Sequence, residues 1–174
     1  MDVDKDLLTE LSTSAQRVQR ALTAAGIAAT ITEHDTSART SAEAAVILGC
    51  HVGQIAKSLV FRAASGTPVL VIASGANRVD VTKISALVGE PIGKADAAFV
   101  REVTGYAIGG IPPLAHAQRL STFIDRDLLA YDVVYAAGGT PHALFPIPPA
   151  DLVRVADGMV ADTRVFASDQ SPGA

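Results

Sequence analysis

The segment from residue 55 to residue 73 constrains the fold most, because it holds two apolar runs separated by a short turn. The runs are Ile55–Phe61 and Val69–Ala73, and both are rich in aliphatic residues. Residues 63–68, Ala-Ala-Ser-Gly-Thr-Pro, contain the Ser, Gly and Pro that favour a turn. We therefore predict a hairpin of two neighbouring strands, Ser58–Arg62 and Val69–Ala73.

Lys57 interrupts the first of these apolar runs, in a chain where only 18% of residues are charged. A buried ammonium is costly to desolvate unless it reaches a cleft or a partner anion, so a lysine here indicates a specific contact. On an edge strand, by contrast, Lys57 would extend its amine to water. The residues alone leave both roles open.

Helices and strands alternate irregularly along the rest of the chain. The predicted helices cover residues 8–25, 44–48, 81–88 and 95–103, with a last one opened by Pro148-Pro149 that runs through Val155. A Thr40/Glu43 capping box precedes the second helix. Besides the hairpin, the predicted strands cover residues 27–32, 106–108, 122–124, 133–136 and 143–145. No strand-helix-strand unit repeats, so we predict an α+β (mixed α/β) fold whose mixed sheet is a barrel or strongly curved, surrounded by helices.

Length and composition indicate one domain. The chain has 174 residues, and hydrophobic residues at 49% are enough to fill a substantial core. We place the domain at residues 1–167 and predict a disordered tail at residues 168–174. The formal charge of -4 and the scarcity of aromatic residues, at 5%, disfavour binding to duplex DNA or to generic single strands. Any nucleic acid would be gripped at one small point.

The residues that bind metals are too few or too scattered for a metal site. Cys50 is the only cysteine, and the four histidines lack metal-ligand spacing. We expect no metal and no cofactor. The N-terminal residues 1–6 are acidic, and no apolar stretch approaches the roughly 20 residues of a membrane span. We therefore expect a cytoplasmic protein that does not enter membranes, and we expect it to be a monomer.

Two loops, at residues 109–113 and 137–142, combine glycine and proline. Glycine lets backbone N–H groups approach a ligand, and the two prolines that follow Ile111 hold the first loop in one shape. Such loops can bind a carbonyl oxygen or an oxyanion. Glycine with proline also forms ordinary turns, and a surface histidine such as His142 is common. From the residues alone, both interpretations stay open.

Four segments, taken together, resemble the YbaK family, which is related to the editing domain inserted in bacterial prolyl-tRNA synthetases. They are residues 53–61 (GQIAKSLVF), 73–80 (ASGANRVD), 105–113 (GYAIGGIPP) and 137–142 (AGGTPH). The resemblance extends from about Thr36 to Val155. It implies a compact mixed barrel with surrounding helices, and an activity that hydrolyses the ester between a wrong amino acid and a tRNA. The implied amino acids are small, namely alanine, cysteine, serine or threonine, and the implied tRNA is that for proline.

The resemblance also implies the site residues. Lys57 would face the acceptor end of the tRNA, and the loop that contains Gly109 and Gly110 would surround the scissile carbonyl, so these three are the expected catalytic residues. The expected substrate-binding residues are Ile111, Pro112, Pro113, Gly139, Thr140 and His142. Some family members carry a different residue at the position of His142, so its role is less closely defined.

This reaction suits a chain with no recognisable nucleophile or metal motif. An aminoacyl ester is already activated, so catalysis needs little beyond a positioned water and donors for the developing oxyanion. The expected partner is the acceptor end of an aminoacyl-tRNA, and whether a tRNA synthetase docks is left open. The alternative is a non-catalytic nucleic-acid-binding or protein-interaction module that has kept the fold.

Overall fold

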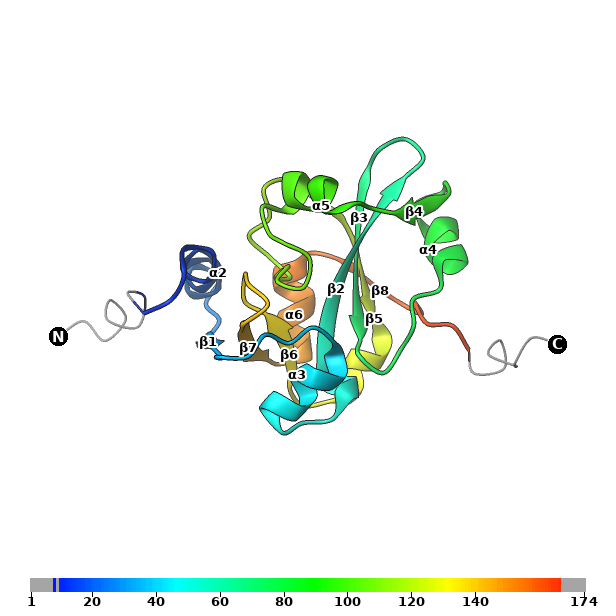
Figure 1. Ribbon diagram of the computed structural model, residues 1–174. Helices are drawn as coiled ribbons and strands as arrows, with labels where there is room; N and C mark the ends of the chain where they lie inside the picture. Colours follow the sequence, from blue (N-terminus) through cyan, green and yellow to red (C-terminus); the bar gives the residue numbers. More distant parts are fainter. Residues whose placement is uncertain (1–7, 9, 167–174) are drawn as a thin grey trace.

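The computed structural model describes residue 8 and residues 10–166 (Figure 1). The predicted tail at residues 168–174 lies outside this part. The α-helices are α2 (Thr13–Ala24), α3 (Ser41–Leu48), α4 (Val81–Val88), α5 (Ala97–Thr104) and α6 (Pro149–Ala156), with 3-10 helices η1 (Val52–Gln54) and η2 (Arg126–Ala130). The strands are β1 (Thr32–Glu33), β2 (Ile55–Ala63), β3 (Pro68–Ser74), β4 (Ile92–Lys94), β5 (Ser121–Asp125), β6 (Val134–Ala137), β7 (Ala143–Ile147) and β8 (Met159–Ala161).

The strands form one mixed sheet, with the order β1-β7-β6-β2-β3-β5-β8 and with β4 paired to β2. The pairs β6–β2, β3–β5 and β5–β8 are parallel, and the other pairs are antiparallel. Figure 1 shows α2 with β1 and β7 at one side of the molecule and α4 at the other. The predicted mixed sheet with surrounding helices is confirmed, and its strand path is open, with β1 and β8 at the ends.

β2 is the central strand of the sheet and carries Lys57. One edge of β2 pairs with β3 as the predicted hairpin, with Lys57 opposite Ala73. The other edge pairs with β6 through Ile55 and Ala56, and with β4 through residues 61–63. Lys57 therefore does not lie on an edge strand. The interpretation in which Lys57 extends its amine to water from an edge strand does not apply.

Alternate side chains of β2 pack into different apolar clusters. Ala56 and Val60 belong to the main core, which also contains buried residues of α2, α5 and α6. Phe61 packs with a second cluster that includes Ile84 of α4, and Ile55 belongs to a third cluster with α3. Because side chains alternate along a strand, Lys57 lies on the face shared by the second and third clusters, between the two.

The first helix is shorter than predicted. It was expected from Leu8, but α2 begins at Thr13 because Ser12 is its N-cap, and the Ser12 hydroxyl accepts a hydrogen bond from Ala15 N–H. The side chain and backbone N–H of Ser12 also donate to the Glu33 carboxylate. These bonds hold the start of α2 against β1. Among the described helices, none combines the length and the apolar character needed to cross a membrane.

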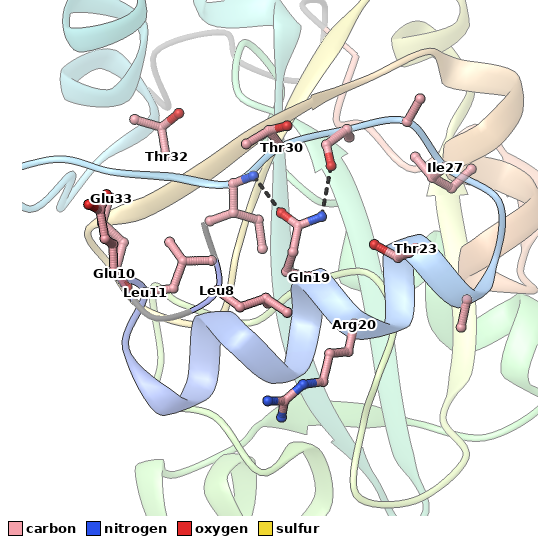
Figure 2. Close-up of a pocket in the computed structure, with 14 residues that line it drawn as sticks. Leu8, Glu10, Leu11, Gln19, Arg20, Thr23, Ile27, Thr30, Thr32 and Glu33 are labelled. Atoms are coloured by element: carbon pink, nitrogen blue, oxygen red, sulfur yellow. Dashed lines mark hydrogen bonds between the residues drawn. The ribbon is translucent and has the colours of Figure 1, made fainter. Parts of the chain in front are cut away.

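Most of the segment predicted as a strand at residues 27–32 does not pair with another strand. Its backbone hydrogen-bonds to the Gln19 side chain instead. Ile27, Ala29 and Ile31 are buried, as the alternation predicted. The Gln19 side chain of α2 donates to Ala29 O at 2.9 Å and accepts from Ile31 N–H at 2.9 Å, as Figure 2 shows. Gln19 thus takes the hydrogen-bonding place of a neighbouring strand, and only Thr32–Glu33 pairs with β7.

The strand predicted at residues 106–108 is wrong, because the chain turns as soon as α5 ends. Gly105 caps α5 with φ 85°, and the Thr104 hydroxyl accepts from Tyr106 N–H at 3.0 Å. Gly110 N–H then donates to Ala107 O at 3.0 Å and closes the turn. The apolar Tyr106 is buried, at 1% exposure, without being in a strand.

Candidate active site

The two glycine loops predicted to form the site contact each other through their backbones. A Cβ added to Gly110 would lie 2.7 Å from Thr140 Cα, which is closer than any side chain fits. Gly109 has φ 91°, a conformation that favours glycine, and a Cβ there would lie 3.7 Å from Pro141 Cγ. The structure therefore brings together two segments that are about thirty residues apart in the sequence.

The first loop offers an exposed backbone donor to a ligand. Gly110 N–H is used within the turn, since it donates to Ala107 O. The amide of Gly109, by contrast, has no partner among the described residues, and Gly109 is exposed. The residues that follow, Ile111, Pro112 and Pro113, are buried behind the loop. They lie where they hold its shape, with Ile111 in the main core.

The second loop packs against the start of α2. A Cβ added to Gly139, which has φ 107°, would lie 2.8 Å from Ser14 O. A Cβ at the preceding Gly138 would lie 2.9 Å from Ile31 Cγ2. Two adjacent positions thus require the absence of a side chain. This packing sets the position of Thr140, which contacts Gly110 from the other side of the loop.

His142 is exposed but oriented by hydrogen bonds. Its Nδ1 lies 3.0 Å from His34 O, and its backbone carbonyl accepts from His34 N–H at 2.8 Å. Its own N–H donates to Thr140 Oγ1 at 3.2 Å. Because a carbonyl only accepts, Nδ1 carries the proton in this bond. In the neutral imidazole, Nε2 is then the acceptor.

Lys57 is half-buried and makes a specific contact. Its Nζ donates to Asn77 O at 2.9 Å, in the loop that follows β3. Burial lowers the pKa of Lys57, and the charge of Asp125 acts in the opposite direction. The sequence-based expectation of a specific contact is therefore met, and the partner is a backbone carbonyl held beside a carboxylate.

Lys57 and the second glycine loop are linked through the sheet. Ala56 pairs with Ala136 in the parallel β2–β6 ladder, so the next residues along, Lys57 and Ala137, lie on adjacent strands. Neighbouring strands are about 4.8 Å apart. The loop that contains Gly139 begins directly after Ala137. The backbone of Lys57 is therefore one strand away from the start of that loop, and the loop contacts Gly110.

Two residues near Lys57 were missed by sequence reasoning. Asp125 is a buried carboxylate, 1% exposed, at the end of β5, and Asn77 hydrogen-bonds to it at 2.9 Å. The signal for Asp125 is similar to the one used for Lys57, a charged residue directly after apolar residues, here Phe123 and Ile124. Asn77 was within a segment that carried the family resemblance, without a role.

A separate cavity of about 780 Å³ lies between α2 and residues 27–33 (Figure 2). Its lining residues include Leu8, Leu11, Gln19, Arg20, Thr23 and Ile27, and none of the predicted site residues is among them. The size of this cavity is therefore not evidence that it is the active site. Among the described residues, no group of three or more His, Cys, Asp or Glu side chains is placed to hold a metal ion.

Comparison with known proteins identifies the family. The family model described as the aminoacyl-tRNA editing domain matches residues 35–155. A crystal structure described as "a putative trans-editing enzyme for prolyl tRNA synthetase" superposes with a TM-score of 0.85 and 46% sequence identity, covering 90% of this chain and 99% of that one. The chain is 30% identical to "Uncharacterized protein YwhH" of Bacillus subtilis (strain 168) over 122 residues, which are 70% of this chain and 78% of that protein.

A third relative is "Putative Cys-tRNA(Pro)/Cys-tRNA(Cys) deacylase EbsC" of Enterococcus faecalis (strain ATCC 700802 / V583). It is 23% identical over 133 residues, which are 75% of this chain and 78% of that protein. The chain belongs to the aminoacyl-tRNA editing domain family, as the resemblance to the YbaK family predicted. It is an enzyme of the aminoacyl-tRNA deacylase class. This finding favours the enzyme over the non-catalytic binding module.

Proposed function

We propose that the protein removes a small, wrongly attached amino acid (alanine, cysteine, serine or threonine) from tRNA, with tRNA(Pro) as the preferred tRNA. The observation that carries this proposal is the backbone contact between Gly110 and Thr140, which places a free amide and an oriented histidine in adjoining loops. The names of two relatives, which concern prolyl-tRNA synthetase and Cys-tRNA(Pro), support the choice of tRNA.

The reaction is the hydrolysis of the aminoacyl ester. A water oxygen adds to the carbonyl carbon, the bond between that carbon and the ribose oxygen breaks, and the ribose oxygen takes up a proton as the amino acid leaves. The Gly109 amide is the donor that we assign to the developing oxyanion, because Gly109 is exposed, Gly110 N–H is used within the turn and Ile111 is buried. Ile111, Pro112 and Pro113 serve the substrate by holding this loop.

Lys57 supplies positive charge to the acceptor end of the tRNA. One of its three N–H donors is used on Asn77 O, and the other two are available to a phosphate or a ribose oxygen. A charge-assisted contact of this kind is stronger than a neutral hydrogen bond. A single such contact also suits a protein with a net charge of -4, which would repel a long phosphate backbone.

His142 sets the choice among small side chains. With Nδ1 bound to His34 O, the neutral ring presents Nε2 as an acceptor that a hydroxyl or thiol of the substrate can donate to. A site that hydrogen-bonds to a substrate hydroxyl discriminates better than an apolar wall. Gly139 and Thr140 add backbone to the amino-acid pocket of this proposal, which leaves little room for a long or aromatic side chain.

A panel of mischarged tRNAs tests this proposal. The protein is incubated with tRNA(Pro) that carries alanine, cysteine, serine, threonine or proline, and with alanine on its own tRNA. We expect hydrolysis of at least one small ester on tRNA(Pro), with prolyl-tRNA left intact. Hydrolysis of all the esters at the same rate would contradict the selectivity, and hydrolysis irrespective of the tRNA would contradict the preference for tRNA(Pro).

The cellular setting is part of the same proposal. We propose a monomer in the cytoplasm that acts on free aminoacyl-tRNA, with docking to a tRNA synthetase as an additional step. Size-exclusion chromatography of the protein, alone and mixed with prolyl-tRNA synthetase, measures both the monomer and the docking. Elution as a dimer would contradict the first, and separate elution of the two proteins at micromolar concentrations would contradict the second.

A further inference from the structure

Asp125 is buried at the end of β5 and is held by three hydrogen bonds. Its carboxylate accepts from the backbone N–H of Ser74 at 3.0 Å and from that of Asp127 at 2.9 Å. It also accepts from the Asn77 side-chain amide at 2.9 Å. Buried polar groups are normally paired in this way, so this carboxylate has a fixed orientation. Neither sequence reasoning nor the proposed reaction uses Asp125.

Asn77 connects this carboxylate to Lys57. The Asn77 side-chain amide donates to Asp125 and also to Asp127 Oδ2, at 2.8 Å. The backbone N–H of Asn77 donates to Ser74 O at 3.0 Å, and its carbonyl accepts from Lys57 Nζ at 2.9 Å. Because Asn77 is bound through both its side chain and its backbone, the carbonyl that holds the Lys57 ammonium has a defined position.

The sheet places Lys57 and Asp125 on one face, on either side of Ala73. Lys57 pairs with Ala73 across β2 and β3. On the other edge of β3, Ile72 pairs with Ile124 in a parallel ladder, so the next residues, Ala73 and Asp125, are also adjacent. The Ala73 side chain is a single methyl group and is fully buried. It leaves room for the two charged side chains to approach each other above the sheet.

Asp125 is the carboxylate whose charge affects the pKa of Lys57. Burial lowers the pKa of Lys57, and the Asp125 charge opposes this effect. The neighbouring Asp127 is paired with Arg164 at 3.2 Å. Lys83 and Arg126 pair with a different carboxylate, that of Asp162, at 3.0 Å and 3.7 Å.

We propose that Asp125 is a positioning residue for Lys57, which acts through Asn77 to hold the Lys57 ammonium where the acceptor end of the tRNA binds. The identity of that ligand rests on the proposed function, but the position and charge of Lys57 do not. Asp125 itself does not touch the substrate. Its effect is to fix one donor of the ammonium and to oppose the lowering of the Lys57 pKa by burial, so that the remaining donors point to the ligand.

The test replaces Asp125 by Asn and follows both the charge of Lys57 and the reaction. The titration of Lys57 is measured by NMR of side-chain Cε in protein labelled with ¹³C-lysine, and kcat and KM are measured with the small mischarged ester of tRNA(Pro) that the wild-type protein hydrolyses fastest. We expect Asp125→Asn to lower the pKa of Lys57 further, because burial remains and the opposing charge is gone. We also expect kcat/KM to fall at least about tenfold.

The matched control is Asp157→Asn, because the Asp157 side chain is 80% exposed and pairs with Arg119 on the surface. It should leave both the Lys57 titration and kcat/KM at their wild-type values. A folded Asp125→Asn protein with wild-type titration and wild-type kcat/KM would overturn the proposal. The titration needs no substrate, so a wild-type protein without deacylase activity would overturn only the proposed function.

The new side-chain amide in Asp125→Asn would face three N–H donors, which can prevent this variant from folding. A second variant keeps the proposal testable in that case. Asn77→Ala keeps the backbone carbonyl and the Asp125 charge but removes the link between them. We expect kcat/KM to fall at least about tenfold with a nearly unchanged Lys57 titration, which separates position from charge. Wild-type kcat/KM in a folded Asn77→Ala protein would show that Asp125 does not position Lys57.

Discussion

Adding one methyl group at Gly110 should nearly abolish deacylation without unfolding the protein. A Cβ at this position would lie 2.7–2.9 Å from three backbone atoms of Thr140. Ordinary carbon contacts are about 3.5–4.0 Å, so the two loops must separate by about 1 Å. The strain comes from this contact, because the left-handed backbone belongs to the neighbouring Gly109, at φ 91°.

The expected loss follows from the displacement of the Gly109 amide. A misplacement of about 1 Å costs about 100-fold in rate, and loss of an oxyanion donor costs about 100- to 1,000-fold. We therefore expect kcat for Gly110→Ala to fall by about 100-fold or more, and for Gly110→Val by more still. Overpacking also destabilises by about 1–3 kcal/mol, which lowers Tm by roughly 2–12 °C for a domain of this size.

The assay compares single-turnover deacylation at 25 °C with a thermal melt of each variant. The matched control is Gly93→Ala, because a Cβ at Gly93 meets nothing within 4 Å and its φ is not left-handed. This variant should keep the wild-type rate. A folded Gly110→Ala protein with the wild-type rate would refute both the contact between the loops as a requirement for activity and the role of the Gly109 amide.

Three further predictions concern the other parts of the site. Lys57→Ala should fold and lose most of its deacylase activity, measured as kcat/KM, and unchanged turnover would remove Lys57 from the site. His142→Ala should change the ranking among the alanine, serine, threonine and cysteine esters more than it lowers the best rate, whereas a uniform loss would make His142 general catalytic machinery. Activity should persist in EDTA, since we expect no metal, and a loss restored only by zinc would contradict this.

The sequence predicted the sheet well where local patterns and long-range packing agree. The apolar runs that flank residues 63–68 form the β2–β3 hairpin, and Pro149 opens α6, as predicted. The interval between Gly105 and Gly110 was misread because Thr104 and Gly105 end α5 in a tight cap, and no pattern of apolar residues reports such a cap. Tyr106 is a residue type that is common in strands, and it is buried, but it lies in the turn that follows α5.

The site was predicted from the sequence only in its parts. Lys57 and the two glycine loops were named as candidates from the sequence, and they stay predictions, but the hydrogen-bond partner of Lys57 was not predicted. That partner is Asn77 O, twenty residues further along the chain and held by Asp125 from a third strand. The register between strands decides this arrangement. For a parallel pair such as β3–β5, no short turn joins the two strands, so their register cannot be read from a single sequence.

The central claim is that this chain hydrolyses the ester of a mischarged tRNA at the site that contains Lys57 and the glycine loops. The most direct measurement is the first-order loss of the labelled amino acid from tRNA(Pro) with the protein in excess, using whichever of the alanine, cysteine, serine and threonine esters is lost fastest. We predict that the wild-type protein makes this loss much faster than the spontaneous hydrolysis and that Lys57→Ala brings it close to the spontaneous rate. A wild-type rate no faster than the spontaneous one, or an equal acceleration by Lys57→Ala, would contradict the claim.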